Sequence, residues 1–160
     1  MVLMDRDEVL RQHLIKLLDG GNAHLGYDRV VADWPAEQRG VRPEGADHSA
    51  WDVLEHLRIC QFDILEFSRN PDYVTIPWPS DQWWPKSHEP ADEAAWDESI
   101  ASFLSDLVEM KNLVQDKTQD LYQPFVWGTG QSLLREAMLV ADHNAYHLGE
   151  LMALKKRLVA

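Results

Sequence analysis

The chain has 160 residues and a formal net charge of -12, with 27 acidic against 15 basic side chains. This length allows one domain with a sizeable core, and because no linker-like stretch divides the chain we predict a single domain over residues 1–160. The excess of negative charge argues against nucleic acid as a partner, because phosphate backbones are bound by basic surfaces.

The first predicted helix begins near Asp5, where apolar residues start to recur at helical spacing. Gly20-Gly21 interrupts the pattern, which then resumes as far as Trp34. The glycines are compatible with a break between two helices, and equally with one long helix that packs closely at that point.

A second helix is predicted from Ser49 to about Asn70. The Ser49 hydroxyl can accept a hydrogen bond from a free backbone amide, and Asp52 favours the positive end of the helix. A third helix is predicted from about Pro90, a residue suited to a first helical turn, toward Asp116.

The fourth predicted helix spans roughly Gln131 to Leu158, with basic residues in its last turns, where cations favour the negative end of the helix dipole. No stretch is convincing as a strand, so the predicted fold class is all-α, a four-helix bundle. One apolar stripe of this helix is interpreted as bundle core or as a dimer seam: Leu134, Met138, Ala141, Ala145, Leu148 and Met152.

A long loop of residues 71–89 separates the second and third predicted helices, and it is rich in tryptophan and proline. The prolines limit its flexibility and the tryptophans bring large apolar area, so we expect it to pack over one end of the bundle. One interpretation makes it a lid or wall beside a functional site, and the other makes it a cover for the core.

Three histidines form the strongest candidate site. His143 and His147 are four residues apart in the fourth predicted helix, so they share a face and can bind one ion. His56 lies in the middle of the second predicted helix, and metal sites in helical bundles are built from side chains that project inward from different helices. The pattern predicts that His56, His143 and His147 bind one divalent metal ion.

The chain resembles the DinB-like superfamily, which includes the YfiT-type metal-dependent hydrolases. The resemblance covers nearly the whole sequence and is carried by four features: His56 and the segments 17–24 (LLDGGNAH), 49–52 (SAWD) and 142–150 (DHNAYHLGE). It implies a four-helix bundle of the DinB/YfiT type that binds one divalent ion, nickel or zinc, through three histidines. These map onto His56, His143 and His147.

Some members of this superfamily are transferases or isomerases that use low-molecular-weight thiols such as mycothiol or bacillithiol. The resemblance therefore implies a small-molecule substrate, with such a thiol as a candidate. Three neutral imidazoles leave an ion its double charge and an open position, as in catalytic zinc sites. Such an ion can lower the pKa of water toward neutrality or deprotonate a thiol.

No general base is evident beside the predicted metal. Asn144 stands where a zincin has its glutamate base, so a metalloprotease is rejected. The missing base favours thiol activation over hydrolysis. We therefore expect a metal-dependent enzyme that resembles a thiol S-transferase. The alternatives are a metal-dependent hydrolase and a non-catalytic metal-binding bundle.

Other residues near these histidines have two interpretations each. Asp52 is placed to accept the second N–H of His56 and Glu150 to approach the metal, but both are equally compatible with solvated helix carboxylates. Tyr146 and Trp127 are candidates for the wall of a substrate cavity, or for the core. Cys60, four residues after His56, is placed on the same helical face, as a thiolate ligand or reactive group, but core packing is favoured for it. No ligand role is given to the remaining histidines: His13, His24, His48 and His88.

The sequence also indicates the cellular compartment of the protein. Cys60 is the only cysteine, which excludes an internal disulfide and suits a reducing compartment. The first eight residues become charged before an apolar signal segment can form, and no stretch approaches the length of a membrane span. We expect a cytoplasmic protein without a membrane partner, and a homodimer stays open.

Overall fold

The computed structural model describes residues 5–159. This part of the chain is all-helical and contains no β-strand, which agrees with the predicted all-α class. The α-helices are α1 (Arg6–Asp19), α2 (Tyr27–Val31), α3 (Ala50–Arg69), α4 (Glu93–Gln115) and α5 (Leu133–Leu158), and two short 3-10 helices are η1 (Ala36–Gln38) and η2 (Asp81–Trp83). The expected absence of a signal segment falls partly on residues 1–4, outside the described residues.

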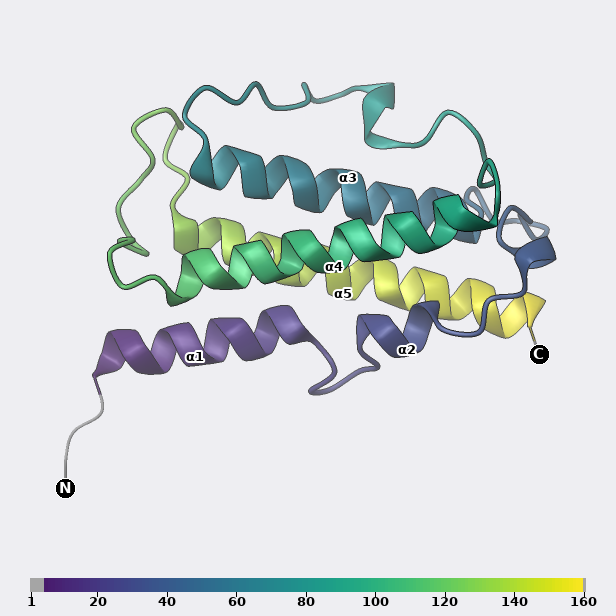
Figure 1. The fold of residues 1–160 in the computed structure, drawn as a ribbon, viewed down its shortest axis with the longest axis horizontal. Coiled ribbons are helices and arrows are strands. Elements are labelled where there is room, and N and C mark those ends of the chain that lie inside the picture. Colours follow the sequence, from purple (N-terminus) through teal and green to yellow (C-terminus); the bar gives the residue numbers. More distant parts are fainter. Residues whose placement is uncertain (1–4, 160) are drawn as a thin grey trace.

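The long helices α3, α4 and α5 lie side by side, and α1 and α2 follow one another along their lower edge in Figure 1. The 71–89 segment runs from the end of α3 back over that helix to the start of α4. Because α3 and α5 are antiparallel neighbours, the middle of α3 faces the middle of α5. The three candidate histidines lie in these two helices.

The glycine pair breaks the N-terminal helical pattern. Gly20 and Gly21 have φ angles of 66° and 72°, in the left-handed region that residues with a Cβ adopt only at a cost. The chain turns there, and helical structure resumes only at Tyr27. The structure thus decides between the two possibilities, and the described residues contain five α-helices where the sequence predicts four.

Helix α3 begins where the sequence predicts, at a reciprocal cap. The Ser49 hydroxyl accepts a hydrogen bond of 3.1 Å from the Asp52 amide, and the Asp52 carboxylate accepts one of 2.9 Å from the Ser49 amide. Each side chain thus satisfies a backbone donor that the first helical turn leaves free.

The starts of the other two long helices lie a few residues later than predicted. Helix α4 begins after Asp92, whose carboxylate accepts from the Ala95 amide at 2.9 Å, slightly later than the predicted start at about Pro90. Helix α5 begins after Ser132, whose hydroxyl accepts from the Arg135 amide. In both cases the side-chain cap fixes the boundary.

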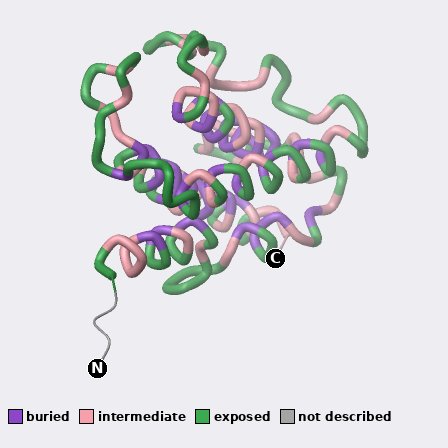
Figure 2. The backbone as a smooth tube through the Cα atoms, turned by 60° about the vertical axis from the view of Figure 1, so that its left-hand side comes forward, coloured by how far each residue is buried: buried purple, intermediate pink, exposed green. Residues whose placement is uncertain are grey.

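Aromatic side chains join the helices in the core. Trp96 of α4 packs against Trp34 and Trp51, with ring centroids 6.1 and 6.5 Å apart, and Tyr27 of α2 stacks on Phe103 of α4 at 4.0 Å. Figure 2 shows buried residues on the inner faces of the long helices, while the 71–89 segment is exposed or intermediate.

The predicted apolar stripe of α5 is core for part of its length only. Ala141 and Leu148 are buried and belong to the core cluster, and Leu134 and Met152 pack against it. Met138, by contrast, is 51% exposed.

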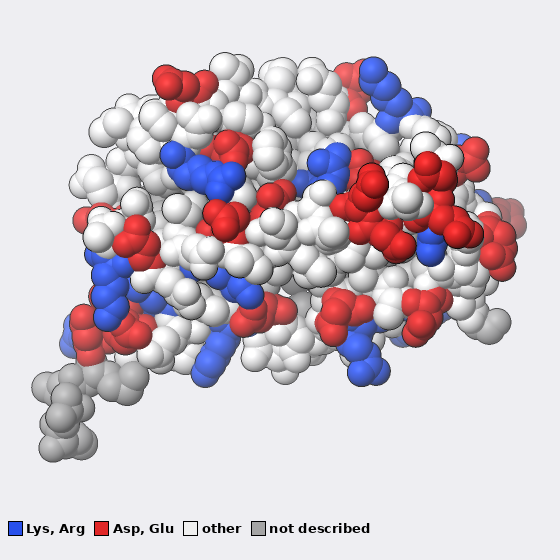
Figure 3. Space-filling view, viewed as in Figure 1, with Lys and Arg blue, Asp and Glu red and all other residues white. Residues whose placement is uncertain are grey.

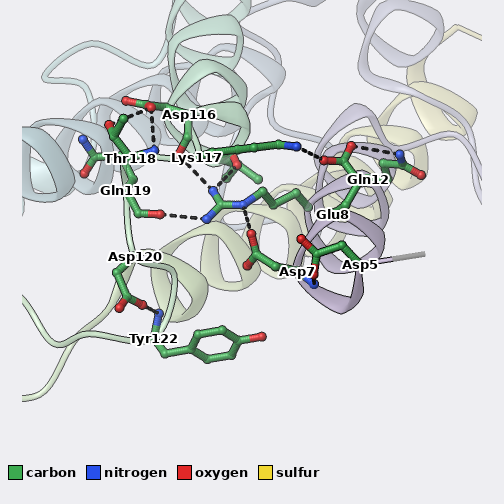
Figure 4. A network of polar contacts seen from close by, with 12 residues as sticks. Asp5, Asp7, Glu8, Gln12, Asp116, Lys117, Thr118, Gln119, Asp120 and Tyr122 are labelled. Carbon is green, nitrogen blue, oxygen red and sulfur yellow. Dashed lines mark hydrogen bonds and ion pairs between the residues drawn. The ribbon is translucent and has the colours of Figure 1, made fainter. Parts of the chain in front are cut away.

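The guanidinium of Arg11 joins α1 to the end of α4. Figure 4 labels three of its partners, Asp7, Asp116 and Gln119. Only 5% of Arg11 is exposed, and it donates to the carbonyl oxygens of Val114 and Gln119 at 2.7 Å each and of Asp116 at 3.1 Å. The carboxylate of Asp7 accepts from its Nε at 2.6 Å. The last carbonyls of a helix have no partner within the helix and carry partial negative charge, so a buried cation suits this position.

Acidic and basic side chains are interspersed on the face shown in Figure 3, and no basic stripe crosses it. No helix among the described residues is long and apolar enough to span a membrane.

Candidate metal centre

Three imidazole rings from two helices meet between α3 and α5. The centroid of the His56 ring lies 5.0 Å from that of His143 and 4.6 Å from that of His147. The rings of His143 and His147 are themselves 4.6 Å apart. The three histidines singled out by the sequence are therefore neighbours, although His56 and His143 are 87 positions apart in the chain.

The backbone of the 71–89 segment holds His56 in place. The Nδ1 atom of His56 lies 2.7 Å from the carbonyl oxygen of Trp83. Because a carbonyl oxygen only accepts, Nδ1 carries the proton and donates, and the lone pair of Nε2 stays free. Metal-binding histidines usually donate their other N–H in this way, which fixes the tautomer and the ring orientation.

A carboxylate holds His147 in the same manner. The Nδ1 atom of His147 lies 2.9 Å from Oε2 of Glu150, and the other oxygen of Glu150 lies 3.2 Å from Nδ1 of His48. The hydrogen bond from His147 is the main reason why the pKa of Glu150 is lowered, so this carboxylate is an ionised acceptor. The proton on Nδ1 leaves Nε2 of His147 as the free ligand atom.

The Nε2 atoms of His56 and His143 face each other at 3.2 Å. Two nitrogens bound to one tetrahedral ion at about 2.1 Å lie about 3.4 Å apart, so the observed separation fits a shared divalent ion. Burial lowers the pKa of His56, and it lowers the pKa of His143 to about 3. Both rings are therefore neutral, which is the form that binds metal.

Cys60 lies at the same place, one helical turn after His56. Its Sγ is 3.6 Å from both ring nitrogens of His56. On one tetrahedral ion, a sulfur at about 2.3 Å and a nitrogen at about 2.1 Å are separated by about 3.6 Å. His56, Cys60 and His143 have ligand atoms that all lie within 4.8 Å of one another, and this group of described residues can hold a metal ion.

Core packing therefore describes only part of the environment of Cys60. Burial raises the pKa of its thiol to about 12, so the group stays protonated unless a cation lies beside it. His147 lies outside the closest group of ligand atoms, although its ring is next to both other imidazoles. Cys60 and His147 are thus the two candidates that accompany His56 and His143.

The indole ring of Trp84, from the 71–89 segment, is stacked between two imidazoles. Its centroid is 4.0 Å from that of His56 and 3.8 Å from that of His48, with interplanar angles of 8° and 18°. The loop thus packs directly on a candidate ligand, as the functional interpretation of this segment predicts. Such a cover limits the access of water to one side of the site.

A cavity of about 690 Å³ opens beside the histidines, within the size range of small-molecule sites. Its wall comes from α3, α5 and the 71–89 segment, and it includes Cys60 and all three candidate histidines. Tyr146 also lines it. Trp127 is absent from this wall and stacks on Phe125 at 5.0 Å, so packing is its observed role.

Asp52 matches neither of its two interpretations, because it does not contact His56 and, at 2% exposure, is not a solvated carboxylate. Its carboxylate caps α3 and lies 2.9 Å from Nδ1 of His88, away from the imidazole of His56. A carboxylate in the first turn of a helix is drawn to the free amides there. The actual partner of His56, the carbonyl of Trp83, belongs to the backbone and leaves no mark in the sequence.

His48 is the residue near the site that the sequence analysis missed. It contacts both Glu150 and Trp84, although it was given no ligand role. No periodic signal links His48 to α5, because it lies before α3 and outside any helix. Glu150 is different, since its position three residues after His147 places it on the same helical face.

Comparison with known proteins gives no match: no protein-family model matches the chain, and neither does any curated protein or solved structure. The function is therefore inferred from the residues and distances above.

Proposed function

We propose that this chain is a four-helix bundle of the DinB/YfiT type that binds one divalent ion, zinc or nickel, through His56, His143 and His147. We further propose that it is an enzyme of the thiol S-transferase kind. The observation that supports this best is the 3.2 Å separation of the two facing Nε2 atoms of His56 and His143. The Nδ1 contacts of His56 and His147 add to it, since each leaves a free Nε2 lone pair.

The residues around such a site have separate roles. The Trp83 carbonyl and the Glu150 carboxylate fix the rings of His56 and His147, so that little reorganisation is needed when an ion binds. Trp84 shields one side from water. A bound divalent ion supplies positive charge that lowers the pKa of a thiol or of water.

The cavity favours a catalytic role over a purely structural one. Closed structural zinc sites have four protein ligands, whereas catalytic sites keep one position for water or substrate. The three histidines lie on the wall of a cavity of about 690 Å³, where a small molecule can reach them. Whether Cys60 also binds the ion distinguishes a catalytic from a structural site, because a fourth bond from its thiol would close the site.

Cobalt spectroscopy tests the proposal. Loaded wild-type protein and the Cys60→Ser variant are compared for sulfur-to-cobalt charge-transfer absorption before and after addition of a low-molecular-weight thiol. We expect no such band in Cys60→Ser alone and its appearance on addition of the thiol. The wild type shows whether Cys60 is itself a ligand.

Two outcomes count against the thiol proposal. A band in the wild type that Cys60→Ser abolishes, with no response to added thiol, indicates a closed site. Turnover of esters or amides that depends on His56, without any response to thiols, replaces thiol activation with hydrolysis.

Removal of the metal is expected to leave the protein folded. The core is built from apolar side chains of all five helices, so the chain needs no ion to reach an ordinary stability. His147→Ala and chelated wild-type protein should both keep helical circular dichroism and a cooperative thermal transition. Global unfolding of either sample would assign the ion a structural role.

Replacing Glu150 with glutamine is expected to weaken metal binding by about 10- to 100-fold, the usual effect of losing a partner of a metal-bound histidine. Glutamine keeps the size of the side chain but removes the negative charge that orients His147. Zinc affinity measured by competition with a chelator checks this. Glu98→Gln, an exposed position in α4, is the matched control and should bind zinc as the wild type does.

A further inference from the structure

Two buried carboxyl groups share the wall of the cavity with the histidines. Asp63 of α3 and Glu136 of α5 both line it, and they are only 6% and 2% exposed. The charge of Asp63 is near enough to contribute to raising the pKa of Glu136, after the larger effect of burial. Neither residue has a place in the metal centre described above.

Each carboxyl group keeps an oxygen without a partner. Asp63 accepts through Oδ1 from the hydroxyl of Tyr73 at 3.0 Å and from the amide of Ile76 at 2.9 Å. Glu136 accepts through Oε1 from Arg135 at 2.6 Å. Among residues 5–159, neither Oδ2 of Asp63 nor Oε2 of Glu136 has a hydrogen-bond donor, although both side chains are more than nine-tenths buried.

The wall of the cavity therefore contains more acidic than basic side chains. Among the described residues of the wall, Arg135 is the only Lys or Arg. Its side chain is 55% exposed, and it donates to one oxygen of Glu136. Burial raises the pKa of both carboxyl groups, which means that their ionised forms are costly there, and a cation between them offsets this cost. The rings of Trp78 and Trp83 on the same wall add attraction for a cation, because aromatic faces carry negative potential.

From these observations we propose that the cavity binds an organic amine, whose ammonium group lies between Asp63 and Glu136 and whose apolar part lies against the tryptophans. Ammonium donates up to three hydrogen bonds, which suits the two free carboxylate oxygens. The amine-binding role needs only the cavity and the two carboxyl groups, so it holds for the metal-free protein.

Combined with the proposed function, on which this step rests, the amine site defines a substrate class. Glu136 lies seven residues before His143 on one helix, which corresponds to about 10 Å of helical rise. A substrate that extends from the two carboxyl groups to the metal centre therefore carries its reacting group about 10 Å from its ammonium group. The expected substrates are therefore elongated amines with an apolar middle.

Calorimetric titration of the metal-free, chelator-treated protein tests the amine site. The probes are 4-phenylbutylamine, 4-phenylbutanol and 4-phenylbutyrate, which share one apolar body and differ in charge. We expect the amine to bind at least about tenfold more tightly than the alcohol, and the acid to bind more weakly than both. Equal binding of amine and alcohol overturns the proposal, and so does tightest binding of the acid, which would make Arg135 the anchor.

Conservative variants locate the amine. Glu136→Gln keeps the acceptor for Arg135 and Asp63→Asn keeps the acceptor for Ile76, so both are expected to fold, and each should reduce the preference for the amine over the alcohol. The exposed Glu98→Gln is the control that should retain it. A preference that persists in both cavity variants contradicts the assignment.

Thermal stability gives a readout that is independent of binding. Burial raises the pKa of Glu136, so its ionisation as the pH rises disfavours the folded state, and a neutral glutamine removes this penalty. Glu136→Gln should therefore melt no lower than the wild type at pH 7 without ligand. The calorimetric titrations contain no metal. A negative result there contradicts the amine site alone, whereas a negative result in the cobalt experiment contradicts the proposed function.

Discussion

Replacing His143 with alanine is expected to abolish stoichiometric binding of zinc or cobalt, with an affinity loss larger than the 10- to 100-fold effect of removing a ligand's partner. His143 belongs to both candidate ligand sets, the three histidines and the group with Cys60. Its Nε2 also faces that of His56 at 3.2 Å, so its removal breaks both candidate sets. Equilibrium dialysis with metal analysis measures the stoichiometry.

Three further variants complete the experiment. His147→Ala and Cys60→Ser separate the two ligand sets, since only the variant that removes a true ligand lowers the stoichiometry. His13→Ala, an exposed histidine in α1, controls for nonspecific binding to imidazole. One bound ion per chain in His143→Ala would exclude the centre between α3 and α5.

Replacing Arg11 with methionine is expected to lower the free energy of unfolding by about 3 kcal/mol, the cost of removing one partner from a buried charge network. Methionine fills similar space but leaves the carbonyls of Val114 and Gln119 without their donor. It also leaves Asp7 without its ion pair. Urea unfolding followed by circular dichroism measures the change.

Lys117→Met is the matched control for this substitution. Lys117 pairs with Glu8 near the same helix ends, but its side chain is 70% exposed (Figure 4). Exposed ion pairs contribute little, so its unfolding midpoint should stay at the wild-type value. Equal destabilisation by both substitutions would mean that the loss of a positive charge, and not the loss of the carbonyl contacts of Arg11, lowers the stability.

Sequence reasoning predicts the parts of this protein that local chemistry determines. The cap at Ser49 is an example, because the residues that satisfy one another are three positions apart. The pairing of His143 and His147 is another, since helical periodicity alone puts both on one face. His56 was found because it is a histidine within an apolar helical pattern.

Features that depend on contacts between distant segments could not be predicted in the same way. The role of Cys60 beside His56 depends on where α5 brings His143, and the contact of His48 with Glu150 joins residues 102 positions apart. The break at Gly20 was ambiguous because glycine permits both a turn and close helix packing. Tertiary packing decides the first two cases, and the backbone conformation of the two glycines decides the third.

The acceptor that orients His56 is a main-chain carbonyl, and this makes the metal centre respond differently to two kinds of evolutionary change. Any residue at position 83 carries that oxygen, so substitutions there keep the contact with His56 as long as the backbone path is kept. Insertions or deletions within residues 71–89 shift the path itself and withdraw the oxygen. The contact with His56 alone therefore places no constraint on the identity of residue 83, whereas it does constrain the length of this segment.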